Sequence, residues 1–122
     1  MNALELALKC RELAERKKAE NVLILDLRGL STLTDYFVIA SGTSEPHLRA
    51  IVEEIIRGVE EEYGLTPEAM DGTWASNWVV LDYYDVIVHI MRPETREYYS
   101  LETLWGDAPR VQPEKASAAH PA

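Results

Sequence analysis

The chain of 122 residues has a single cysteine, few basic residues and no long apolar run. Because Cys10 has no second thiol in the chain, an intramolecular disulfide is excluded, and we expect it to be a small apolar residue on a helix face. No stretch approaches the roughly 20 apolar residues that a membrane-spanning helix needs. The N-terminal residues mix acids with apolar side chains, which is not a signal-peptide pattern. We therefore expect a cytoplasmic protein that makes no membrane contact.

Basic residues are too few for a direct grip on nucleic acid. Lysine and arginine number 12 against 21 aspartates and glutamates, which gives a formal net charge of -9. Phosphate binding draws on clustered lysine and arginine, so the balance excludes direct sequence-specific nucleic-acid binding and favours a basic protein partner. The apolar fraction of 47% is enough for a core in one domain and is too high for wholesale disorder.

Hydrophobic periodicity divides the chain into helices and strands. Three- and four-residue steps predict helices over 3–18 and 45–63, the second with an N-cap at Ser44 and a stop at Gly64. Continuous apolar runs predict buried strands over 21–27 and 35–41. A strand pair over 78–82 and 86–91 follows a predicted loop at 65–77, and 92–108 reads as a short helix and a second turn capped by Ser100.

This order of elements predicts a single-domain α/β fold. Strands mixed with helices imply a mixed sheet of three to five strands with flanking helices. The composition changes at Pro109 to small residues and prolines. We therefore place the domain at 1–108 and a disordered C-terminal tail at 109–122.

The apolar stretch "NWVVLDYYDVIVHIM" (77–91) contains Asp82, Asp85 and His89. If Tyr83 and Tyr84 form the turn, Asp82 faces Asp85 and Trp78 faces His89 on one mixed side of a hairpin. The other side is then aliphatic and is the one to bury in the core, through Val79, Leu81, Val86, Val88 and Ile90.

These polar residues could carry chemistry or recognition. Asp82, Asp85 and His89 are spread along a hairpin and do not converge as metal ligands must, and acids that flank a turn are typical of turn chemistry. We therefore expect no metal, no cofactor and no catalytic residue. The interpretation we favour is a mixed recognition surface of the kind found at protein interfaces.

Two other segments leave alternatives open. "SGTSEPH" (41–47) resembles a phosphate-binding loop before a helix but lacks the P-loop lysine, so a well-capped helix is the simpler reading. The alternative function is a nucleotide-binding or nucleotidyltransferase-like enzyme that uses Ser41 to Ser44 with Asp82 or Asp85. The segment 96–105 contains Tyr98, Tyr99 and Trp105. Aromatic residues of these types anchor protein interfaces, but they also pack in hydrophobic cores, so the segment could serve either role.

Several segments together resemble the ribosomal silencing factor family, also called Iojap-like proteins. The matching stretches are "LDLRGLSTLTDYFVIASGTSEPHLRAI" (25–51) and "DGTWASNWVVLDYYDVIVHIMRPETREYYSLETLWGDA" (71–108). Two positions depart from the family pattern: Asp71 stands where a glutamate is usual, and Tyr84 stands at the usual glycine of the hairpin turn. If that position needs a positive φ, Tyr84 is strained.

The resemblance implies an α/β fold related to the nucleotidyltransferases but without their catalytic acids, and no enzyme activity. It implies a repressor of translation that binds the fourteenth protein of the large ribosomal subunit on the intersubunit face and so blocks subunit joining. It also implies a homodimer when free. A dimeric scaffold that acts only through its own interface is a further alternative. The partner-binding residues we predict are Trp78, Asp82, Tyr83, Asp85, His89, Tyr98, Tyr99 and Trp105.

Overall fold

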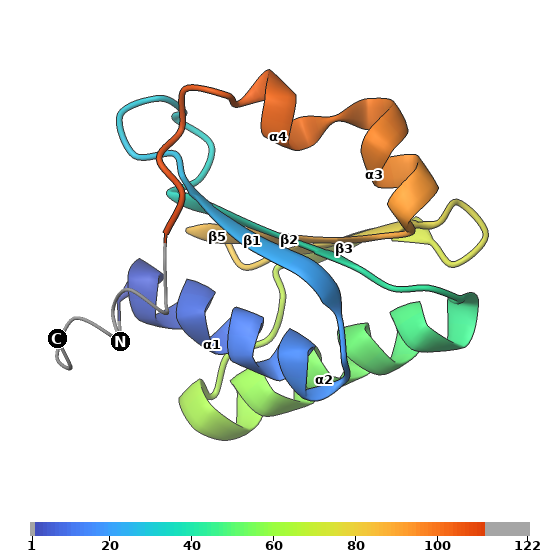
Figure 1. Ribbon diagram of the computed structural model, residues 1–122. Coiled ribbons are helices and arrows are strands. Elements are labelled where there is room, and N and C mark those ends of the chain that lie inside the picture. The colour runs from blue at the N-terminus through green and yellow to red at the C-terminus, as the bar shows by residue number, and fades with distance from the viewer. Residues whose placement is uncertain (1, 112–122) are drawn as a thin grey trace, which may run out of the picture.

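The computed structural model describes residues 2–111 and shows a sheet with helices on both faces (Figure 1). In chain order the elements are α1 (Ala3–Arg16), β1 (Glu20–Asp26), β2 (Tyr36–Ser41), α2 (Glu45–Tyr63), β3 (Ala69–Thr73), β4 (Trp78–Asp82), β5 (Val86–Met91), α3 (Pro93–Tyr99) and α4 (Leu101–Leu104). The predicted α/β class is confirmed.

The five strands form one mixed sheet in the order β1-β2-β5-β4-β3. Strands β2 and β5 run parallel at its centre, and the other neighbours are antiparallel. Helices α1 and α2 cover one face, and the short helices α3 and α4 lie on the other (Figure 1). The central parallel pair brings together two segments that are about 50 residues apart in the sequence.

Local capping chemistry sets the ends of the two long helices. Asn2 and Glu5 form a reciprocal capping box at the start of α1, which satisfies backbone donors there. The Ser44 hydroxyl accepts from the backbone N–H of His47 at 3.2 Å, and Gly64 ends α2 with φ of 71°. Glycine adopts this left-handed conformation without strain. Both predicted boundaries of α2 are confirmed.

The main core lies between the sheet and the pair α1 and α2. The predicted aliphatic side of the hairpin is confirmed as its floor, since Val79, Leu81, Val86, Val88 and Ile90 are all fully buried. Cys10 is buried in the same core, and burial raises the pKa of its thiol to about 12. Cys10 is thus a core residue of α1, as predicted.

The hairpin register differs from the prediction by two residues. Asp82 pairs with Ile87 and not with Asp85, and Tyr83 donates its backbone N–H to the carbonyl of Val86 at 2.9 Å. The turn is therefore formed by Tyr84 and Asp85. Because side chains alternate with a period of two, a shift of two residues leaves every side chain on its predicted face. The predicted pairings are wrong, but the predicted sorting into faces is right.

Tyr84 occupies the turn in a conformation that suits glycine. Its φ is 77°, and Asp85 donates its N–H to the carbonyl of Tyr83 at 3.0 Å across it. The Asp82 carboxylate accepts from the N–H of Tyr84 at 2.7 Å and helps to hold the turn. A side chain in this region costs about 1–2 kcal/mol. The strain expected from the sequence is therefore present.

We expect Tyr84→Gly to raise the free energy of unfolding by about 1 kcal/mol, because relief of the φ strain exceeds the entropy that glycine adds to the unfolded chain. Urea denaturation followed by circular dichroism measures the change. Tyr84→Ala is the matched control: it removes the same exposed ring but keeps the Cβ atom, so it should give no gain. An equal gain from both variants would show that the ring, not the backbone, carries the cost.

Two further predictions need correction. The predicted loop 65–77 contains the edge strand β3, whose five residues are all exposed and therefore show no apolar alternation. The predicted tail begins too early, because the residues just after 108 pair with β1 through a bridge between Leu25 and Arg110. Residues 112–122 of that predicted tail lie outside the described part of the chain.

A candidate recognition surface

Aromatic side chains gather on the face of the sheet that carries α3 and α4. They come from five separate segments, and we call them the aromatic cluster: Phe37, Trp78, His89, Tyr98, Tyr99 and Trp105. Trp78 and His89 lie on β4 and β5, Phe37 on β2, the two tyrosines at the end of α3, and Trp105 just after α4.

The rings contact one another in a chain that leads from the sheet to the surface. Phe37 packs edge-on against His89 with centroids 4.5 Å apart, and Trp78 lies 4.8 Å from Tyr99. Tyr99 in turn contacts Tyr98 at 4.9 Å. Such pairs contribute about 0.5–1.5 kcal/mol beyond the area that they bury. The outer end is open to solvent, since Tyr98 is 81% exposed and Tyr99 is 53% exposed.

His89 supports the cluster from beneath. It is buried, and its Nδ1 accepts a hydrogen bond from the indole N–H of Trp78 at 3.1 Å. Nδ1 can accept only in the neutral ring with the proton on Nε2. Burial lowers the pKa of His89 from 6.5 to about 4, because the charged ring would lose its hydration. His89 therefore holds Trp78 in place as a neutral acceptor at physiological pH.

A partly buried ion pair holds the α3–α4 layer against the sheet. The Arg96 guanidinium donates from Nε to Glu102 at 2.9 Å and from Nη1 to the Ser41 hydroxyl at 3.0 Å. These bonds connect α3, α4 and β2. Helices of seven and four residues are too short to be stable alone, so this polar contact and the packing of Leu101 position the tyrosines over Trp78.

The structure brings five of the eight predicted contact residues into the cluster. Asp82 lies on the same face of β4 as Trp78 but caps the hairpin turn, and Asp85 is exposed in that turn. Tyr83 points the other way: it is only 7% exposed and belongs to the core against α1 and α2. Burial raises the pKa of Tyr83. A surface contact by Tyr83 does not agree with this position.

One member of the aromatic cluster, Phe37, was absent from the predicted set. Phe37 joins the cluster because β2 pairs with β5, which places Phe37 opposite Ile87 and beside His89. Side chains alternate between the two faces of a strand, so the run 35–41 could have shown that Phe37 and Val38 lie on opposite faces of the sheet. The neighbours of Phe37 on β5 could not be read from the sequence, because they depend on the tertiary pairing of the two strands.

The loop considered as a phosphate-binding site uses its polar groups internally. His47 accepts from the backbone N–H of Thr43 through Nδ1 at 2.9 Å and donates from Nε2 to the carbonyl of Lys17 at 2.7 Å. His47 thereby joins the start of α2 to the end of α1. Within residues 2–111, no three histidine, cysteine, aspartate or glutamate side chains converge as a metal site. No helix in that range is long and apolar enough to cross a membrane.

Fold and surface together define a small α/β protein whose conspicuous feature is an exposed aromatic face suited to binding another macromolecule. A family model described as "Ribosomal silencing factor during starvation" matches residues 1–122. The chain therefore belongs to the ribosomal silencing factor family and is a ribosome-associated translation regulator, not an enzyme.

Individual relatives agree with this assignment. The chain is 43% identical over 93 residues to the ribosomal silencing factor RsfS of Bacillus subtilis (strain 168). The aligned region covers 76% of this chain and 78% of that protein. It is 35% identical over 95 residues to the mouse protein named "Mitochondrial assembly of ribosomal large subunit protein 1", covering 76% of this chain and 42% of that one.

Solved structures share the fold. A protein from Chromobacterium violaceum superposes with a TM-score of 0.82 at 30% identity and covers 87% of this chain and 88% of its own. A protein from Bacillus halodurans gives a TM-score of 0.71 at 37% identity, covering 89% and 95%.

Proposed function

We propose that this protein represses translation by binding the fourteenth protein of the large ribosomal subunit, on the face that meets the small subunit. The bound domain then occupies space that the small subunit needs, so joining is blocked without any chemistry. The observation that supports this most is the aromatic cluster, whose outer tyrosines stand exposed on a supported base. Exposed aromatic groups of this kind mark binding surfaces.

Within the surface we assign different roles to the predicted residues. Trp78, Tyr98, Tyr99 and Trp105 make the direct apolar contacts, and exposed Asp85 adds a polar rim with Asp82. His89 acts from below by holding the Trp78 indole. Tyr83 contributes through the core that supports the hairpin and not through contact.

Charge adds attraction to the aromatic contacts. The formal net charge is -9, and proteins that bind ribosomal RNA are generally basic. Opposite net charges speed the encounter and orient the partners. We place this encounter in the cytoplasm, where the ribosomes of bacterial relatives work, and we infer that the free chain is a homodimer that shields its exposed apolar residues.

Co-sedimentation with purified large subunits tests the proposal. The protein should pellet with large subunits, and preloading should lower the yield of joined ribosomes on a sucrose gradient when small subunits are added. Cross-linking followed by mass spectrometry identifies the contacted ribosomal protein. Binding without any loss of joining, or cross-links confined to another ribosomal protein, would count against the mechanism.

Salt should weaken this association. Raising ionic strength from about 0.05 M to about 0.5 M shortens the Debye length, so we expect affinity for large subunits to fall about tenfold. Fluorescence titration across a salt series, with magnesium held constant, measures the slope. An affinity that does not change with salt would show that the acidic surface plays no part in the encounter.

A further inference from the structure

The α3–α4 layer, residues 93–108, is attached to the rest of the fold by few buried side chains. In α3 only Arg96 is buried, and in α4 only Leu101 is buried. Ala108 is the one other buried residue of this segment. By contrast, α1 contributes five buried residues and α2 contributes six. Because burial of apolar surface is the main favourable term in packing, the layer is weakly held in comparison with the long helices.

Both ends of the layer are fixed by backbone hydrogen bonds. Before α3, the Arg92 N–H donates to the carbonyl of Asn77 at 3.0 Å. After α4, the Asp26 N–H donates to the carbonyl of Pro109 at 2.8 Å. Ser100 separates the two helices with a φ of 48°. The segment between the fixed ends can therefore leave the sheet and return without any change in the pairing of the strands.

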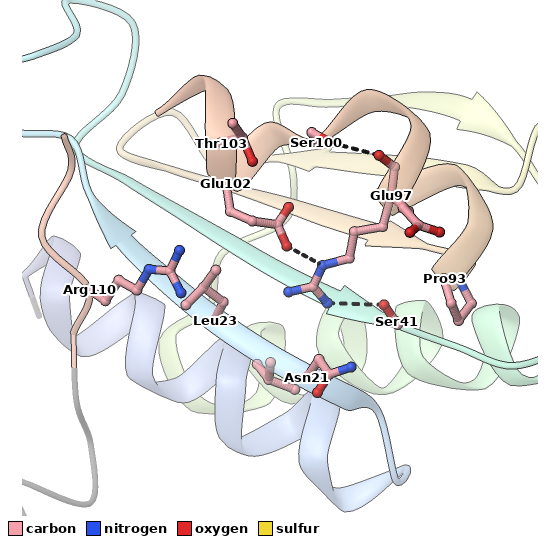
Figure 2. A pocket seen from close by; sticks show the side chains of 11 residues that line it. Asn21, Leu23, Ser41, Pro93, Glu97, Ser100, Glu102, Thr103 and Arg110 are labelled. Carbon is pink, nitrogen blue, oxygen red and sulfur yellow. Dashed lines mark hydrogen bonds and ion pairs between the residues drawn. The ribbon is translucent and has the colours of Figure 1, made fainter. Parts of the chain in front are cut away.

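The layer does not seal against the neighbouring edge strand. A groove of about 660 Å³ lies between β1 and the two short helices (Figure 2). Arg96 extends from α3 to the Ser41 hydroxyl and is held by Glu102 of α4 (Figure 2). One charged side chain thus joins both short helices to β2. Its loss should therefore release both helices together.

Three polar atoms in or beneath the layer have no hydrogen-bond partner among residues 2–111. They are Nε of Arg92, Nε2 of His89 and Oε1 of Glu102, and all three are buried. His89 carries its proton on Nε2, because Nδ1 accepts from Trp78, so a buried N–H group is left unpaired. A buried donor or acceptor without a partner costs free energy that contact with water removes. Opening of the layer exposes these atoms to water, so they favour the open state.

We propose that the α3–α4 layer is a lid that opens as one unit while the sheet, α1 and α2 stay folded, and that the recognition surface is complete only when the lid is closed. With the lid closed, Tyr99 lies 4.8 Å from Trp78, so a partner meets the tyrosines of α3 and the indole of β4 as one surface. A partner that touches both holds the lid shut, which couples binding to closure. This coupling rests on the proposed function, whereas the opening itself does not.

Amide hydrogen exchange of the free full-length protein, followed by NMR, tests the opening. The Ser100 N–H is bonded to Arg96 in α3, and the Trp105 N–H is bonded to Leu101 in α4. These two amides should share one protection factor, at least about a hundredfold below that of Val88 at the centre of the sheet. Arg96→Met should speed exchange at both sites about tenfold and leave Val88 unchanged.

Two further variants control this measurement. Arg57→Met removes an arginine from an exposed ion pair on α2 and should change neither site. Glu102→Gln weakens the contact with Arg96 from its other end and should act in the same direction as Arg96→Met. Unequal effects at Ser100 and Trp105, or no effect of either variant of the ion pair, would overturn the proposal.

Purified large subunits test the coupling. Saturating subunits should slow exchange across 93–108 at least about tenfold, as read by mass spectrometry. Arg96→Met alone should keep the affinity within about twofold, because its lid is still closed most of the time. Arg96→Met together with Leu101→Ala removes both buried side chains of the short helices and should lower the affinity at least about fivefold, while β5 stays protected from exchange.

The outcomes separate the lid from the proposed function. Undiminished affinity of the double variant, or binding that leaves exchange of the lid unchanged, would overturn the coupling. A protein that binds no large subunits refutes the proposed function and the coupling together, and the NMR data on the free protein then decide the opening by themselves.

Discussion

Trp78→Ala should lower the affinity for the large ribosomal subunit by about 2 kcal/mol, or roughly thirtyfold. Trp78 is the ring that joins the buried and exposed halves of the aromatic cluster, through its hydrogen bond to His89 and its contact with Tyr99. Its loss removes a large apolar contact and the support beneath Tyr99. Titration of labelled protein with purified large subunits measures the change.

Trp74→Ala provides a matched control for this experiment. Trp74 packs against the opposite core and carries the Arg49 guanidinium over its ring at 4.8 Å. The same truncation there should change affinity by less than about 0.5 kcal/mol. Trp78→Phe keeps an apolar ring but removes the indole N–H. It should therefore give a loss of affinity between those of the other two variants. A folded Trp78→Ala protein with undiminished affinity would move the recognition surface elsewhere.

Stability should fall by about 3 kcal/mol as the pH drops from 7 to 4, owing to His89 alone. Burial lowers the pKa of His89 to about 4 in the folded protein, whereas the unfolded chain has the ordinary value of 6.5. Between these values the unfolded state binds a proton that the folded state does not. The contribution is therefore fully present above pH 6.5 and is lost progressively as the pH falls to 4.

His89→Gln isolates this effect from the carboxylates that titrate nearby. Glutamine can still accept from the Trp78 indole N–H, but it does not titrate. Urea denaturation at several pH values should show a shallower loss of stability for the variant between pH 6.5 and 4, whatever its stability at neutral pH. Parallel profiles for the two proteins would mean that His89 is protonated without cost in the folded state.

Much of the local structure could be read from the sequence. The bounds of β4 and β5 match the prediction, and Ser44 and Gly64 end α2 where expected. The φ strain at Tyr84 was also foreseeable, because a tyrosine stands where the family has glycine. These features depend on residues close together in the chain, so their free energies are set by nearby side chains.

The parts that were missed depend on partners distant in the chain. β3 has no apolar pattern because its side chains are all exposed, and it is a strand only because β4 offers an edge. Tyr83 was expected in the hairpin turn, but the turn lies one residue later, so Tyr83 stays on the face that packs against α1 and α2.

The sequence by itself determined the helices, four of the five strands, the buried aliphatic side of the hairpin and membership of the ribosomal silencing factor family. Only the tertiary structure decided that β2 lies beside β5, which places Phe37 against His89, and that Arg96 holds the tyrosines over Trp78. The reason is physical: side-chain periodicity and capping are local, whereas strand order and ring contacts depend on which distant surfaces bury one another.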